Sequence, residues 1–283
     1  MTHGPWNLLL MLGTLAAAAA ACSTSTTARS RDPVACDAPC RPGPAEIAEP
    51  LSAGLSAPRE RVEVSETFNR HWRDGKAELS GYEVTTMRYG HARKGHAVLI
   101  YVTEPMDRRT WIKDDALDAG EHQVDVLKLN HQLTFRTGIY PYSVMTSVFA
   151  PVGGQGRERF APAKISLTAQ EWCGHVYHQL HPKGTRLHGE LHSYFGSEGN
   201  RRQTIATPAG TLYEDALLIQ LRELDGPFAG GADWSGSLVP SLWWTRTAHR
   251  PPRPVPATIR RSLATRDGAR VTRFEVERAG VTW

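Results

Sequence analysis

The sequence predicts a mainly β protein, with an antiparallel curved sheet or open barrel and one or two helices, in a single domain over residues 62–283. Three observations predict this class. Segments in which apolar residues alternate with polar ones recur along the chain, as in strands with one buried face. Clusters of Gly and Pro separate these segments at short intervals, as in antiparallel sheets. Helical spacing of apolar residues occurs in only two places, and about 220 residues are enough for one sizeable core.

The first 21 residues have the features of a secretory signal peptide. The apolar run over residues 8–21 is too short to span a membrane and fits the central segment of a signal peptide. The small residues Ala19, Ala20 and Ala21 stand directly before Cys22, and this arrangement resembles the lipobox of bacterial lipoproteins. The resemblance implies that Cys22 is acylated, for example with palmitate, and begins the mature chain. Ser23 is similar to the pattern of outer-membrane lipoproteins, and an ordinary cleaved signal peptide is the alternative.

Residues 22–61 predict a disordered tether, because they are rich in Ser, Thr, Ala and Pro and show no sustained periodicity. A flexible chain of this length spans roughly 40 Å, so the domain can stand off the membrane. Cys36 and Cys40 lie in the tether, and in an exported protein such a pair is expected to form a disulfide. A metal or redox pair is the alternative, and Cys173 is left over in either case.

The domain is expected to begin with an amphipathic helix followed by four strands. Val64, Phe68 and Trp72 are spaced four apart, as on one face of a helix within residues 62–74. Alternating or β-branched residues predict strands over the ranges 81–89, 96–103, 123–135 and 143–152. The second of these is apolar on both faces, which indicates a central strand.

The stretch 165–200 is the most distinctive, because it holds five of the twelve histidines and the only cysteine beyond the N-terminal region. Alternation and aromatic residues predict one strand through residues 165–177. Pro and Gly at 182–184 predict a turn, and a second strand follows over 186–195. The stretch is therefore expected to be two strands joined by a turn.

The side chains of this stretch leave three interpretations open. A zinc site could form if four potential ligands converge from the paired strands: Cys173, His175, His188 and His192. Alternatively, Cys173 is a nucleophile with His175 or His178 as its base. We favour the third interpretation, in which the histidines lie on a polar or partly buried face and Cys173 is a small core residue. We then expect no catalytic residue, no metal and no other cofactor.

The C-terminal third is expected to contain the main helix and three more strands. The apolar residues within 211–224 have helical spacing, with Thr211 as N-cap and Glu214 completing a capping box. Strands are predicted over 238–250, 258–263 and 271–276. The first of these strands carries Trp243 and Trp244, one on each face.

The net charge of +4 is unevenly distributed along the chain. Residues 243–283 contain nine arginines and three acidic residues, so this end is basic and the rest of the chain is slightly acidic. A basic end could face anionic lipid headgroups, although arginines on a solvated strand face are the simpler interpretation. Nucleic acid is not expected as a partner of an exported lipoprotein.

Several strings between Trp72 and His249 resemble an uncharacterised family of bacterial exported lipoproteins, some of which carry the label "septum formation inhibitor Maf". They are ELSGYEVTTMRYG, GHAVLIYVTEP, VLKLN, TGIYPYSVMTSVF, QEWCGHVYHQL and SYFGSEG. The resemblance implies an exported lipoprotein and supplies neither an activity nor catalytic residues. Maf pyrophosphatases carry a motif like S-x-S-P-R-R, and the nearest match, residues 56–61, lacks the second consecutive arginine. We therefore expect no nucleotide pyrophosphatase chemistry.

These observations predict a lipoprotein of the cell envelope, anchored through Cys22 and facing the periplasm, with the outer membrane as the favoured location. A curved sheet crossed by a helix can enclose an apolar cavity, as in periplasmic lipoprotein carriers and lipocalins. We expect the domain to bind an apolar or amphipathic envelope ligand, or a protein partner. The alternatives are an envelope hydrolase or metalloenzyme that uses Cys173 and its neighbouring histidines, and a purely structural envelope component.

Overall fold

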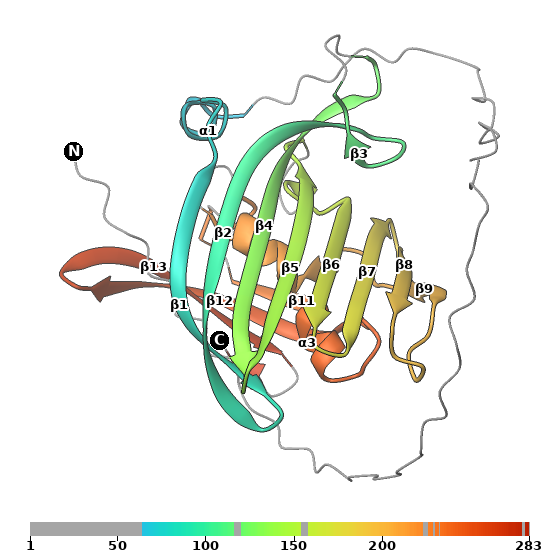
Figure 1. Ribbon diagram of the computed structural model, residues 1–283. Helices are drawn as coiled ribbons and strands as arrows, with labels where there is room; N and C mark the ends of the chain where they lie inside the picture. Colours follow the sequence, from blue (N-terminus) through green and yellow to red (C-terminus); the bar gives the residue numbers. More distant parts are fainter. Residues whose placement is uncertain are drawn as a thin grey trace, which may run out of the picture. The chain divides into compact units, whose positions relative to one another are not determined.

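The computed structural model describes residues 64–115, 120–153, 158–222, 226–228, 230–231, 233–278 and 281–282. These residues belong to one compact unit. They form two curved sheets, of which the larger is a half-barrel, together with short helices (Figure 1). The predicted fold class is therefore confirmed. The expected signal peptide and tether, with Cys22, Cys36 and Cys40, lie outside the described residues.

The larger sheet has nine strands, all paired antiparallel, in the order β1-β2-β4-β5-β6-β7-β8-β9, with the short β3 paired to β2. The bounds are β1 (Glu78–Arg88), β2 (His91–Asp107), β3 (Ile112–Lys113), β4 (Gln123–Thr137), β5 (Tyr140–Pro151), β6 (Lys164–Glu171), β7 (Gly174–Lys183), β8 (Arg186–Ser193) and β9 (Arg201–Ala206). Consecutive strands are neighbours because short connections join most of them.

The smaller sheet and the helices follow or flank this meander. Its strands are β10 (Leu212–Tyr213), β11 (Trp234–Val239), β12 (Val255–Arg266), β13 (Ala269–Arg278) and β14 (Val281–Thr282). The helices are α1 (Glu66–Trp72), the 3-10 turn η2 (Glu214–Ala216), α2 (Leu217–Gln220) and α3 (Leu242–Thr247). No helix in the described ranges combines the length and apolar character that a membrane crossing requires.

The main core lies on the inner face of the larger sheet. Burial alternates along its strands, so that every second residue points inward, as a period of two requires. This face packs against residues of β10, η2, α2, β11 and α3, among them Tyr213, Ile219 and Leu242. Helix α1 adds Phe68, which stacks on Phe160, and Trp72, which packs on Tyr101. A second cluster joins Leu217, Trp234, Leu238, Ile259 and Val276 beneath the smaller sheet.

Three predicted elements differ from the structure. The single strand predicted over 165–177 is two strands, because the chain turns at Trp172 and Cys173. The range 211–224, predicted to be one helix, contains the two-residue strand β10 followed by the short helices η2 and α2. Thr211 does not act as the N-cap, because its hydroxyl donates a hydrogen bond to the Pro208 carbonyl at 2.6 Å.

The strand predicted over 238–250 ends at Val239 and becomes α3. Ser241 starts this helix, because its hydroxyl accepts a hydrogen bond from the Trp244 amide at 3.1 Å. Strand β2 pairs with β1 on one side and with β4 on the other, as expected of a central strand, although it lies second from the sheet edge. Its apolar residues are not all buried: Ala97, Leu99 and Tyr101 are buried, and the residues between them are partly exposed. Strand β9 was not predicted at all.

Candidate functional site

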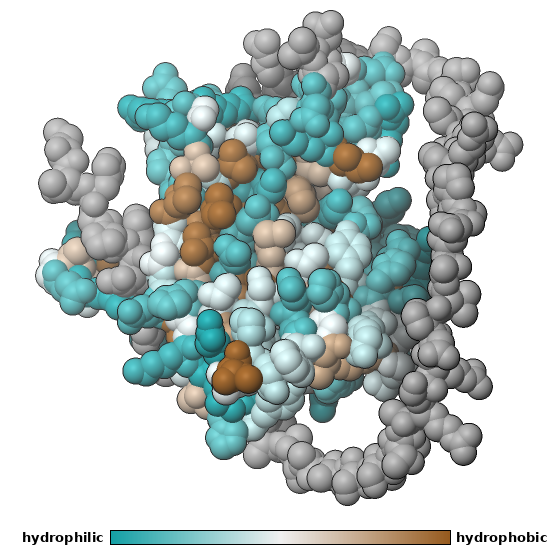
Figure 2. All heavy atoms as spheres, in the orientation of Figure 1, coloured by the Kyte–Doolittle hydropathy of each residue, from teal (hydrophilic) through white to brown (hydrophobic). Residues whose placement is uncertain are grey.

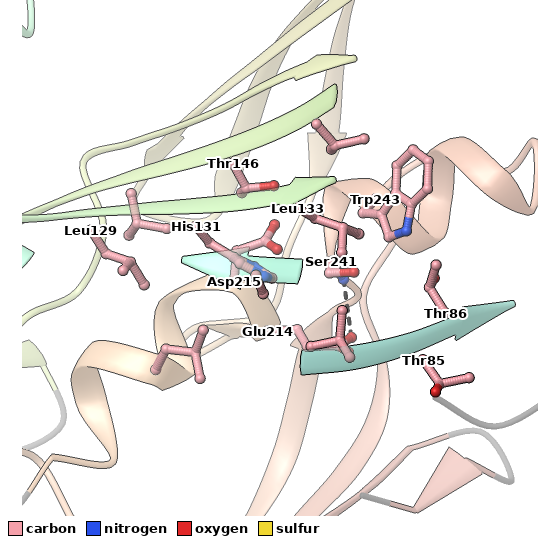
Figure 3. Close-up of a pocket in the computed structure, with 15 residues that line it drawn as sticks. Thr85, Thr86, Leu129, His131, Leu133, Thr146, Glu214, Asp215, Ser241 and Trp243 are labelled. Carbon is pink, nitrogen blue, oxygen red and sulfur yellow. Dashed lines mark hydrogen bonds between the residues drawn. The ribbon is translucent and has the colours of Figure 1, made fainter. Parts of the chain in front are cut away.

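A hollow lies between the inner face of the larger sheet and the segment formed by η2, α2 and the start of α3 (Figure 3). Its volume is about 900 Å³ only when the open mouth is counted, and the room that it leaves for water-sized molecules is about 90 Å³. Strands β1, β2, β4 and β5 supply most of the wall, through Val84, Thr85, Thr86, Ala97, Leu129, His131, Leu133, Val144, Thr146 and Val148. Glu214, Asp215, Leu218, Ser241 and Trp243 supply the rest.

The strand register explains why this wall is mostly apolar. On β4, Leu129, His131 and Leu133 are alternate residues and so share the inner face. Across the ladder, His131 is opposite Leu99 on β2 and Thr146 on β5. His131 is therefore the one imidazole in a described wall otherwise made of aliphatic, hydroxyl and carboxyl groups and the indole of Trp243.

Burial lowers the pKa of His131 to about 4, because the charged imidazolium loses its hydration there. The ring is therefore neutral at pH 7 and offers one N–H donor and one acceptor nitrogen. Within the described part of the chain, His131 makes no hydrogen bond. The His131 side chain is partly exposed to the hollow, so its ring nitrogens are available to hydrogen-bond a bound molecule.

Two adjacent carboxylates close the opposite side of the hollow. Glu214 accepts hydrogen bonds from the Ser241 amide at 3.0 Å and from Nε of the buried Arg278 at 2.6 Å. Asp215 accepts one from the Leu242 amide at 2.9 Å. These bonds attach the first residues of α3 to η2, and Figure 3 shows both carboxylate-bearing residues beside the wall of β4.

The pKa of Asp215 is raised to about 7. Burial is the main cause and the neighbouring Glu214 charge adds to it, whereas the hydrogen bond from the Leu242 amide and the charge of Arg278 act in the opposite direction. Asp215 thus changes protonation near neutral pH, whereas His131 stays neutral. Among the residues that the structure describes, no Lys or Arg lines the hollow. An anionic group placed inside would therefore find no cation to pair with it, and the hollow suits an apolar molecule with a neutral or hydrogen-bonding polar group.

The side chains that the sequence suggested as a site are placed elsewhere. Cys173 is exposed in the turn between β6 and β7, so its prediction as a core residue is wrong. His175 is exposed at the start of β7, and His192 lies on the outer face of β8, where its Nε2 is 3.1 Å from Glu190. His188 lies on the same outer face, with Nδ1 3.2 Å from the Thr204 hydroxyl.

The structure does not gather these residues into a metal site. Among the residues that it describes, no group of three or more His, Cys, Asp or Glu side chains is placed to hold an ion. His178 lies instead on the inner face of β7, buried and directly opposite Leu167 and Leu191. It is therefore on the other side of the sheet from His188 and His192, and its Nε2 has no partner in the described structure.

Neither His131 nor Asp215 is among the candidate site residues expected from the sequence. A signal for His131 was present, because it falls between Leu129 and Leu133 in the inward-facing alternation of β4. For Asp215 there was none, since its burial depends on the way that α3 folds back onto η2.

No family model, no curated protein and no solved structure matches this chain. The resemblance to exported lipoproteins therefore stays a prediction.

Proposed function

We propose that this protein is a lipid-anchored envelope lipoprotein whose half-barrel binds an apolar or amphipathic small molecule in the hollow. The observation that carries the proposal is the hollow itself, whose mostly apolar wall contains one imidazole, His131, that makes no hydrogen bond within the described structure. Apolar pockets with a few polar groups are the usual form of small-molecule sites. The apolar part of the ligand lies against Leu129, Leu133 and Val144, and its polar group hydrogen-bonds His131.

The envelope location rests on the lipobox-like residues before Cys22. A chain anchored there by acylation and joined to the domain by a tether keeps the half-barrel close to a supply of amphipathic molecules. Carriage or sensing of such a molecule fits the hollow better than catalysis does. None of the described lining residues is a cysteine or a lysine, and both carboxylates already accept hydrogen bonds from the start of α3.

The test uses residues 22–283 with Cys22→Ser, exported and purified without detergent. Native mass spectrometry is expected to show a bound mass of lipid or other apolar character, and the neutral fluorophore N-phenyl-1-naphthylamine is expected to bind with micromolar affinity. Ala97→Phe fills the hollow from β2 and is expected to reduce the affinity for the fluorophore at least tenfold. Thr146→Phe fills it independently from β5 and has the same expected effect.

The matched control is His96→Phe, which adds a similar side chain to the exposed face of the same strand. It is expected to leave the affinity within twofold of the parent. If the parent carries no apolar mass and does not bind the fluorophore, the binding proposal fails and a structural role becomes the better account. If Ala97→Phe and His96→Phe reduced the affinity for the fluorophore equally, the fluorophore would be binding outside the hollow.

A further inference from the structure

A rim of exposed apolar side chains marks one end of the larger sheet. In its antiparallel order, the connections β1–β2, β4–β5, β6–β7 and β8–β9 all lie at the same end, the lower one in Figure 1. Each connection carries a large apolar or aromatic side chain that is between 61% and 77% exposed: Tyr89, Ile139, Trp172 and Tyr194. We call these four residues the rim. Most large apolar side chains are buried, so such a gathering at one end marks an interaction surface.

Local contacts hold the aromatic members of the rim in place. Trp172 stacks on Tyr140, with ring centroids 4.0 Å apart. The Tyr89 hydroxyl is 3.0 Å from that of the buried Tyr142. Tyr194 packs so closely on Gly174 that a side chain there would collide with its ring. These side chains are therefore ordered before any partner arrives, which reduces the entropic cost of binding.

The charges at this end are mostly positive. The carboxylates that flank the connections, Glu171 and Glu198, are both paired with arginine: Glu171 with Arg88 and Arg246, and Glu198 with Arg246. Four further cations have no acidic partner among the described residues: Arg93 and Lys94 in the β1–β2 hairpin, Arg136 before the β4–β5 turn, and Arg250 after α3. This end therefore combines aromatic side chains with uncompensated positive charge.

We propose that the rim docks on the surface of an anionic lipid bilayer. Trp and Tyr favour the membrane–water interface, where an apolar ring and a polar edge are both accommodated. Lys and Arg beside them gain from the negative potential of anionic lipids. A protein partner or a second copy is a weaker fit, because unpaired cations would then need matching carboxylates to be buried with them.

This docking goes beyond ligand binding and does not depend on it, although the two features share strands. Thr86 and Val144 of the hollow lie three residues before Tyr89 and five residues after Ile139, respectively. A docked rim therefore places the hollow within a few residues of the lipid surface.

The test measures co-flotation of residues 22–283, carrying Cys22→Ser, with phosphatidylglycerol vesicles and with phosphatidylcholine vesicles. Ile139→Ser with Trp172→Ser removes two rim side chains and is expected to weaken binding to phosphatidylglycerol at least tenfold. The matched control is Leu79→Ser with Ile112→Ser, which changes side chains of similar exposure, 65% and 62%, at the opposite end of the sheet. It is expected to bind within twofold of the parent.

A charge variant tests the electrostatic part separately. Lys94→Gln with Arg136→Gln is expected to weaken binding to phosphatidylglycerol about fivefold for each cation removed, and the difference is expected to shrink with added salt. Because both side chains lie near exposed turns, this variant keeps the test informative if the apolar variant does not fold.

The exposed Cys173, next to Trp172, provides a direct reporter. With Cys36 and Cys40 also replaced by Ser, a polarity-sensitive fluorophore on Cys173 is expected to shift to shorter wavelength when phosphatidylglycerol vesicles are added. The same fluorophore on Ile112→Cys, in a chain carrying Cys173→Ser, is expected not to shift.

Three outcomes would overturn the proposal. The parent does not float with either vesicle, or the rim variant and the control variant lose binding equally. Alternatively, light scattering shows that the parent self-associates and that the rim variant is monomeric, which would assign the rim to contacts between copies of this chain.

Discussion

His131 is the residue at which the proposed binding role and stability would oppose each other. Its imidazole is partly desolvated in the wall of the hollow and has no hydrogen-bond partner among the described residues. We expect His131→Leu to raise the free energy of unfolding by about 1 kcal/mol, because an apolar side chain of similar size replaces a polar one in a mostly apolar wall. Urea denaturation of the ligand-free chain measures this change.

The control for this prediction is His96→Leu, on the exposed face of β2, which is expected to change stability by less than about 0.5 kcal/mol. A loss of stability in His131→Leu would show that the imidazole makes a stabilising interaction in the folded chain. The same variant is expected to bind ligands with a hydrogen-bonding group less tightly, while its affinity for a purely apolar fluorophore is retained.

Residues such as these show how far sequence reasoning reaches at this scale. Period-two alternation is enough to place His131 inward, since the pleat of a strand fixes the face of every residue once one is known. Alternation does not predict that Cys173 is exposed. The residue lies in a two-residue turn between β6 and β7, and the sequence suggests one continuous strand there. The burial of Asp215 depends on its contact with the Leu242 amide, which is distant in the sequence, so no local pattern predicts it.

At the scale of elements, α3 is attached to the fold by charged groups as well as by its apolar side chains. Arg278 on β13 is only 2% exposed and donates to Glu214, whose carboxylate also accepts from the start of α3. We expect Arg278→Ala to reduce the free energy of unfolding by about 3–5 kcal/mol, because it leaves the Glu214 charge without its partner. Urea denaturation followed by circular dichroism measures the loss.

The matched control is Arg260→Ala, on the adjacent strand β12, whose arginine is largely exposed and 3.8 Å from Glu277. Exposed pairs contribute little, so a loss of less than about 1 kcal/mol is expected. Adding Glu214→Gln to Arg278→Ala is expected to recover part of the stability, since it removes the unpaired charge. If Arg278→Ala and Arg260→Ala reduced the free energy of unfolding equally, the ion pair of Arg278 with Glu214 would not stabilise the attachment of α3.

The sequence predicted the strands of the larger sheet better than the elements that cover it. Alternation is a local signal, and β1, β2, β4 and β5 all contain the predicted ranges or nearly so. Helix α3 is short and rich in Trp and Thr, which are residues that favour strands. The residue preferences of this segment therefore predict a strand where the structure has a helix. Its start at Ser241 after Pro240 was the available signal. The basic C-terminal segment was expected on a solvated face, yet Arg246 and Arg278 are buried in ion pairs.

For the molecule as a whole, the buried ionisable groups connect stability to pH. The pKa values of His131 and His178 are lowered by burial to about 4, so between pH 4 and 6.5 the unfolded chain binds protons there that the folded chain does not. Nearby Arg201 lowers the pKa of His178 further, and Glu198 opposes this. These two histidines therefore make stability fall as the pH falls from 6.5 towards 4.

Asp215 acts in the opposite direction. Its pKa of about 7 lies above the unfolded value of 3.8, so between these values the folded chain binds a proton that the unfolded chain does not. Its contribution is fully present at low pH and is lost as the pH rises through 7. Among these three groups, two histidines against one aspartate leave a net uptake of about one proton on unfolding near pH 5.5, which corresponds to a loss of about 1 kcal/mol of stability per unit of acidification. Burial also lowers the pKa of His181, which adds to this loss.

Variants separate the two contributions, and urea denaturation at pH 5, 6 and 7 measures them. Asp215→Asn removes the opposing group, so the loss of stability with acidification is expected to become about twice as steep. His131→Leu removes one histidine, so the slope between pH 5 and 6 is expected to fall by about 1 kcal/mol per pH unit. Glu277→Gln, on an exposed side chain, is the control and is expected to keep the slope of the parent. If Asp215→Asn left the slope unchanged instead, Asp215 would be ionised in the folded chain throughout this range. The hollow would then present a fixed negative charge to its ligand and would favour molecules with a cationic group.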